Sequence, residues 1–99
     1  MNRENNKIIA KFMGYELTTD GIQTLYYDKD RNLKALPKYD KDWNWLMEVV
    51  EKIEDLGFEI EINGLSCRIL TPNKQIETSG KTKIKGVYNG CVEFIKWYN

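Results

Sequence analysis

The sequence has no histidine, only two cysteines and two prolines, and no long apolar run among its 99 residues. Without histidine, Ser-His and Cys-His nucleophilic pairs, histidine acid–base catalysis and the commonest zinc ligand are excluded. The longest apolar runs fall well short of the ~18 residues that span a bilayer, and no secretory signal is recognisable. We therefore expect a cytoplasmic protein that does not enter a membrane.

Other chemical motifs are also missing. Cys67 and Cys91 fall on predicted apolar faces and form no short metal-type pair, so buried free thiols are expected. The segment Asp28-x-Asp-x-Asn32 opens like a calcium loop, but Leu33 and Tyr39 stand where that loop needs glycine and glutamate, which leaves a polar turn. The glycines are scattered singly, without a phosphate-binding loop. The sequence thus predicts no cofactor, no metal site and no enzyme.

The charges balance, with 15 basic and 15 acidic side chains. A zero net charge argues against a nucleic-acid binder, which normally has a basic excess. The distribution is uneven, because residues 42–65 hold seven acidic and one basic side chain, whereas residues 66–99 hold two acidic and six basic ones. Two interpretations stay open: a fold whose charges complement each other internally, or a charged docking face.

Three helices are expected in a single domain that covers residues 1–99. Their apolar spacing places them at about residues 3–13, from Asp40 or Asp42 to Gly57, and from near Thr82 to residue 98. The residues predicted to face the core are Ile8, Ile9, Phe12, Met13, Leu46, Val49, Val50, Ile53, Leu56, Ile84, Val87, Tyr88, Cys91, Val92, Ile95 and Tyr98.

Alternating apolar residues predict a β-hairpin over residues 58–70. Asn63-Gly64 is a favoured two-residue turn, which would set Ile62 opposite Leu65 and Phe58 opposite Ile69. The other face of the hairpin would be polar, with Glu59, Glu61, Ser66 and Arg68. A third strand is expected around residues 75–78. Residues 15–38, with a possible turn at Asp20-Gly21, form either a second short hairpin or an ordered loop.

Two sets of residues are candidates for binding a partner. Trp43 and Trp45 lie two positions apart on a helix and cannot face the same way, so each is either core or an exposed anchor. Gly86-x-x-x-Gly90, with Trp97 as a wall, is either solvated or covered by a loop, or forms a groove for a partner or a second copy. The partner itself is unidentified.

Several stretches together resemble small phage and prophage proteins of gut Bacteroidetes that are similar to the phage ABA-sandwich domain. These stretches are Ala10-Lys-Phe-Met-Gly14, Tyr39-x-x-Asp42-Trp-Asn-Trp-Leu-Met47, Val50-Glu-Lys-Ile53, Val87-Tyr-Asn and Val92-Glu-Phe-Ile-Lys-Trp-Tyr-Asn99. The resemblance covers both ends and the centre of the chain, but not residues 15–38. It implies a helix–sheet–helix sandwich and carries no functional residue.

The pattern predicts an α+β fold, in which three helices pack on a small antiparallel sheet that contains the 58–70 hairpin. The polar hairpin face favours two layers with that face in water, and an α/β/α sandwich is the alternative. Our functional prediction is a phage or prophage accessory protein that acts as a non-catalytic protein-interaction module, or by self-association. A nucleic-acid-associated protein is the alternative, and an enzyme comes last.

Overall fold

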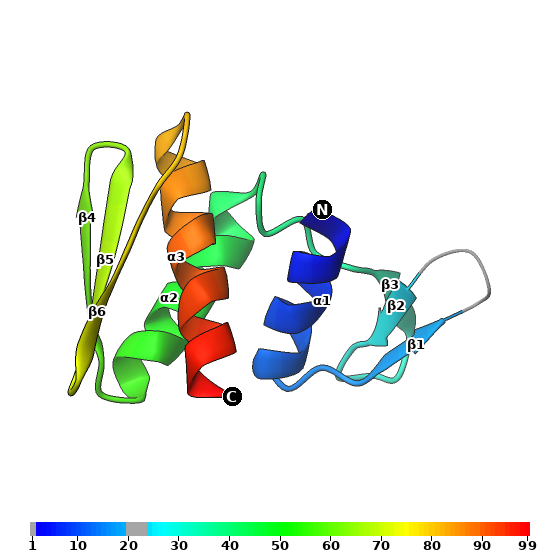
Figure 1. Cartoon of the computed structure of the whole chain (residues 1–99). Coiled ribbons are helices and arrows are strands. Elements are labelled where there is room, and N and C mark those ends of the chain that lie inside the picture. Colours follow the sequence, from blue (N-terminus) through cyan, green and yellow to red (C-terminus); the bar gives the residue numbers. More distant parts are fainter. Residues whose placement is uncertain (1, 20–23) are drawn as a thin grey trace.

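Three helices lie between two small antiparallel sheets in the computed structural model, which describes residues 2–19 and 24–99 (Figure 1). The elements are α1 (Asn2–Phe12), β1 (Leu17–Thr19), β2 (Thr24–Tyr27), β3 (Leu33–Ala35), α2 (Trp43–Asp55), β4 (Glu59–Asn63), β5 (Ser66–Thr71), β6 (Lys74–Ser79) and α3 (Lys83–Tyr98). The predicted α+β class is therefore confirmed. No helix among the described residues is long and apolar enough to cross a membrane.

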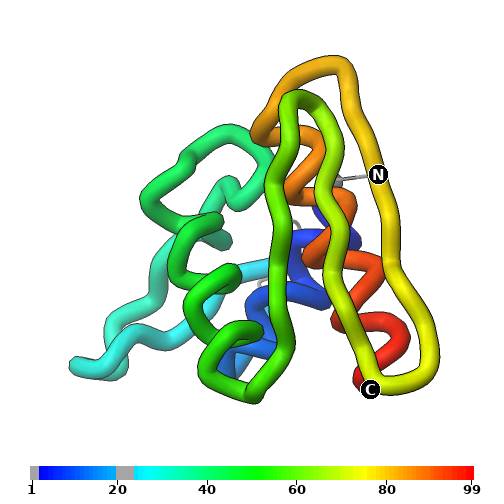
Figure 2. Tube along the Cα trace, turned by 90° about the vertical axis from the view of Figure 1, so that its left-hand side faces the viewer, coloured from blue at the N-terminus to red at the C-terminus, as the bar shows by residue number. Residues whose placement is uncertain are grey.

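All the helices lie on one side of the β4–β6 sheet. Helix α3 packs against β5 and β6, α2 packs against β4, and α1 packs against α3 (Figures 1 and 2). Within the described part of the chain, nothing covers the opposite face, and Glu61 and Ser66 are exposed there. The favoured arrangement of helices on one face is thus found, and the α/β/α layering implied by the resemblance is not. The β1–β3 sheet, on the far side of α1, adds a layer beyond the predicted two.

The helices begin and end close to the predicted residues because their signals are local. Asp42 caps α2 through a hydrogen bond from the Asn44 N–H at 2.9 Å, and Thr82 caps α3 through one from the Lys85 N–H at 3.2 Å. Gly57 follows α2 at a φ of +99°, a conformation that disfavours other residues. Two predicted core positions are wrong: Leu56 and Tyr98 lie at helix ends and are 40% and 45% exposed.

The hairpin of β4 and β5 forms, but its pairing differs by two residues from the predicted one. Ile62 lies opposite Cys67 and not opposite Leu65, so Gly64 and Leu65 form the turn in place of Asn63-Gly64. Because the shift is even, the paired residues keep their predicted faces. Leu65, predicted on the core face, lies in the turn and is 51% exposed, so that prediction is wrong. The third strand, predicted around residues 75–78, is present as β6.

A long-range contact explains the turn. The Leu65 carbonyl accepts a hydrogen bond from the Gly80 N–H at 3.1 Å, just before α3. The same carbonyl lies so close to Gly86 of α3 that a β-carbon there would overlap the carbonyl oxygen. Gly64 has a φ of +61°, which suits the first central position of a two-residue turn. The register therefore depends on the position of α3, and the local sequence pattern of the hairpin carries no information about that position.

The β1–β3 sheet resolves the uncertain segment in favour of a hairpin. Leu17 pairs with Tyr26 and Thr19 with Thr24, while β3, which was not predicted, pairs with β2. Residues 20–23, which include the predicted Asp20-Gly21 turn, lie outside the described residues. The polar turn after β2 is confirmed: the Asp28 side chain accepts hydrogen bonds from the N–H groups of Asp30 and Asn32.

The core lies between the β4–β6 sheet and the three helices. Most of the predicted helix stripes are buried, and they meet Cys67, Ile69 and Ile76 from the sheet. Burial raises the pKa of the Cys67 thiol to about 11, and burial also raises the pKa of Cys91 above its usual value. Both thiols therefore stay protonated at neutral pH, which argues against a nucleophilic role. The expected buried free thiols are present.

Candidate functional site

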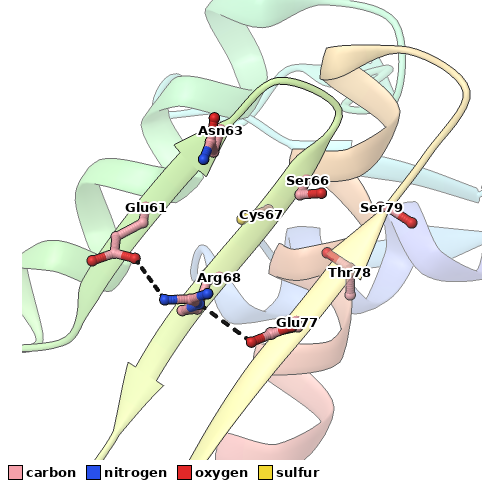
Figure 3. A pocket seen from close by; sticks show the side chains of 8 residues that line it. All are labelled: Glu61, Asn63, Ser66, Cys67, Arg68, Glu77, Thr78 and Ser79. Atoms are coloured by element: carbon pink, nitrogen blue, oxygen red, sulfur yellow. Dashed lines mark hydrogen bonds and ion pairs between the residues drawn. The ribbon is translucent and has the colours of Figure 1, made fainter.

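The open face of the β4–β6 sheet carries a ladder of charges across its three strands. Arg68 of β5 lies between Glu61 of β4 and Glu77 of β6, and it forms ion pairs with both at 3.3 Å (Figure 3). The antiparallel register places these three residues directly opposite one another. All three side chains are about half exposed, so each pair contributes at most about 1 kcal/mol to stability.

A shallow polar hollow surrounds this ladder, with Asn63, Ser66 and Ser79 at its rim (Figure 3). Glu61 and Glu77 share one guanidinium and stand in water, without the shielded cleft that a catalytic acid needs. Within residues 2–19 and 24–99, no three cysteine or carboxylate side chains are placed to hold a metal ion together. The face is therefore polar and open to solvent.

Trp45 and Trp97 pack into the protein and are only partly exposed. Trp45 meets the Tyr39 ring edge-on, with centroids 6.2 Å apart. Trp97 meets Phe58 edge-on at 5.8 Å and lies beside Phe94 at 5.8 Å. Each indole thus stabilises the fold, and each offers a partner less of its surface than an exposed anchor would.

Gly86 and Gly90 do not form a groove for a partner, because the protein's own sheet occupies that side of α3. Both are buried. A β-carbon on Gly86 would overlap the Leu65 carbonyl oxygen, and one on Gly90 would lie 2.8 Å from the Cys67 sulfur. The interpretation of these glycines as a solvated face is therefore wrong as well. Their small size allows the helix to approach the sheet closely.

Trp43 is the candidate that stays open to a partner. It is 38% exposed, and Met47, one turn further along α2, is 39% exposed. Both lie away from the Trp45 edge of the helix, since residues two apart point about 160° apart. Helix α2 packs against β4, and the two run antiparallel (Figure 2). Because Trp43 is the first residue of α2 and Ile62 is near the end of β4, the two lie toward the same end of the pair.

We call Trp43, Met47, Ile60 and Ile62 the α2–β4 edge. Ile62 is 37% exposed, although the period-2 pattern assigned it to the buried face. Its position on an outer strand explains this, because β4 has a neighbour on one side only. Trp43 was a predicted candidate, but the exposure of Ile62 was not predicted.

Buried polar groups elsewhere serve the fold. The Tyr88 hydroxyl donates to the Asn6 amide oxygen at 3.0 Å, and the Asn6 amide donates to an Asp40 carboxylate oxygen at 3.4 Å. These contacts join α3, α1 and the segment before α2. Burial raises the pKa of both Tyr88 and Tyr39 above the usual value, so both phenols are neutral at physiological pH.

The fold is similar to that of a phage protein from Bacillus cereus ATCC 14579, known from a crystal structure. The two chains share 19% sequence identity with a TM-score of 0.77, over 97% of this chain and 88% of the other. No protein-family model and no curated protein matches the sequence. At this identity the likeness establishes a shared fold.

Proposed function

We propose that this chain is a phage- or prophage-derived accessory protein that binds another protein in the cytoplasm and has no catalytic activity. The fold shared with a Bacillus cereus phage protein supports the phage origin, and so does the resemblance to phage proteins of gut Bacteroidetes. The thiols are buried and protonated, and the charged side chains of the open sheet face stand in water. Both features favour binding over catalysis.

The observation that carries this proposal is the exposed tryptophan on the helix that packs against an outer strand of the sheet. Trp43 and Met47 are exposed on α2, the helix that packs against β4, and aromatic and methionine side chains are enriched where proteins bind one another. The surrounding surface is acidic, since α2 and β4 together also hold Glu51, Glu54, Asp55, Glu59 and Glu61. Acidic side chains repel nucleic acid, so a protein partner is favoured over it.

Affinity capture from infected or lysogenic cells tests this function. The tagged wild-type protein would be compared with Trp43→Ser and with Leu33→Ser, which removes a 50% exposed leucine on β3. We expect one protein to be retained by the wild type and by Leu33→Ser, and to be lost with Trp43→Ser. Recovery of nucleic acid alone, in a salt-sensitive manner, would support the nucleic-acid alternative and contradict the proposal.

A further inference from the structure

We propose that β4 binds an extended segment of the partner protein as a fourth strand of the sheet, and that basic and apolar side chains alternate in that segment. This inference rests on the proposed function and specifies how the α2–β4 edge would perform it. The recognised chemistry is an unfolded or edge-strand peptide in which lysine or arginine alternates with valine, isoleucine or a similar residue.

The backbone of β4 has free hydrogen-bonding groups. A two-residue turn closes on a hydrogen-bonded pair, here Asn63 with Ser66, and bonded and non-bonded pairs then alternate along the strands. The N–H and C=O groups of Ile60 and Ile62 therefore point away from β5, toward the open edge. In the described part of the chain, β4 pairs with β5 alone. A peptide laid along β4 would complete these bonds, as in other cases of strand addition.

The side chains of β4 define what the added strand must carry. Glu59 and Glu61 project on the open face, where cross-strand neighbours with positive charge are favoured. Ile62 projects on the other face, where Trp43 and Met47 of α2 are also exposed. Because successive residues of a strand alternate between faces, the complementary peptide alternates basic with apolar side chains.

The charge near this edge selects a basic partner over a second copy. Glu51 and Glu54 lie on the exposed side of α2, and the single basic residue of that helix, Lys52, is turned away to donate to the Phe12 carbonyl at 2.5 Å. Arg68 divides its charge between Glu61 and Glu77. Pairing β4 with the β4 of another molecule would bring glutamates together, which is destabilising.

The other outer strand, β6, is a natural comparison. By the same alternation Gln75, Glu77 and Ser79 present their backbone groups outward, but the Ser79 carbonyl already accepts a hydrogen bond from the Asn89 amide at 3.0 Å. Strand β6 itself carries no exposed large apolar side chain. It therefore offers a control site with similar backbone geometry and no apolar rim.

The test uses an eight-residue peptide of alternating lysine and valine, capped at both ends, with binding measured by isothermal titration calorimetry. Ile62→Pro removes an outward N–H without breaking a bond to β5, and Gln75→Pro does the same on β6. We expect the wild type and Gln75→Pro to bind equally, and Ile62→Pro to bind at least about tenfold more weakly. Equal binding by Ile62→Pro would overturn the proposal.

Three further measurements keep the test independent of folding and of charge alone. Glu59→Lys, at an exposed position, should also weaken binding while the circular dichroism spectrum stays that of the wild type. The same peptide N-methylated at every residue, which leaves no N–H group on either edge, and a glutamate–valine peptide should both fail to bind. Binding of the N-methylated peptide as tight as that of the parent would mean that charge alone attracts it, and strand addition would be rejected.

The capture experiment distinguishes a failure of strand addition from a failure of the proposed function. If the captured cellular protein is lost with Trp43→Ser but retained by Ile62→Pro, the interaction module stands and strand addition fails. If capture is lost with both variants and retained by Gln75→Pro, strand addition is supported for the native partner as well.

Discussion

The two sheets of this protein differ in how they are held. In the β4–β6 sheet the inner residues Cys67, Ile69 and Ile76 are buried under α2 and α3. The strands of the β1–β3 sheet have three or four residues each, and β3 is exposed throughout. Among the described residues of these strands, Tyr26 alone is buried. The first sheet is part of the core, and the second is an addition to it. Stability should therefore depend on the first far more than on the second.

The largest expected effect is that of Gly86→Ala. The new methyl group would overlap the Leu65 carbonyl oxygen, which belongs to backbone and cannot rotate away. We expect a loss of about 3 kcal/mol or more in the free energy of unfolding, measured by urea denaturation. Gly14→Ala, beside the smaller sheet, meets no atom within 4 Å and has only its φ of +89° to oppose it, so about 1 kcal/mol is expected. Similar losses for both would contradict the close contact.

Truncating one apolar side chain in each sheet compares the two directly. Ile69→Ala removes a fully buried side chain between β5 and the helices, so we expect a loss of about 2–5 kcal/mol. Leu25→Ala, at a half-buried position in β2, should cost about 1 kcal/mol or less. Denaturant midpoints measure both variants. If Leu25→Ala were as costly as Ile69→Ala, the smaller sheet would have to be counted as part of the core.

Alkaline pH should weaken the larger sheet first. The pKa of Cys67 rises from 9.0 to about 11 on folding because the thiol is buried. Above pH 9 the unfolded chain releases this proton while the folded chain keeps it, so stability falls with rising pH between about 9 and 11. Thermal unfolding at several pH values measures this slope. Cys67→Ala should reduce the slope in that window without abolishing it, because burial also raises the pKa of Cys91. An unchanged slope would assign it to groups other than Cys67.

The smallest expected effect belongs to the open face of the larger sheet. Glu77→Gln removes one of the two ion pairs of Arg68, both of which are half exposed. We expect a change of about 0.5 kcal/mol or less in the free energy of unfolding, and less still at high salt. A larger loss, measured by urea denaturation at two salt concentrations, would mean that the charge ladder is a structural element and not a surface feature.

Local signals in the sequence predicted much of the fold. Caps at Asp42 and Thr82 and the stop at Gly57 set helix boundaries within a residue or two, because a cap acts on its own first turn. The strand faces followed from alternation. The hairpin register did not, since the contact of Leu65 with Gly80 and α3 joins segments that are distant along the chain.

The candidate site was predicted only in part. The helix wheel separated Trp43 from Trp45 but could not show which indole the Tyr39 segment would cover. It also set Gly86 and Gly90 in the open, because nothing local indicates that a sheet will lie against glycine. Ile62 is exposed because β4 is an outer strand. The order of the strands in the sheet depends on the whole topology, so a local pattern could not predict it.

The most direct test of partner binding at the α2–β4 edge is a nuclear magnetic resonance titration with the lysine–valine peptide. We predict that the amide signals of Ile60 and Ile62 and the indole N–H of Trp43 shift together, and that hydrogen exchange at the two isoleucine amides slows. Signals of Gln75 and Glu77 in β6 should stay in place. Shifts confined to β6, to the β1–β3 sheet, or to the carboxylate side chains without the β4 amides would contradict the account.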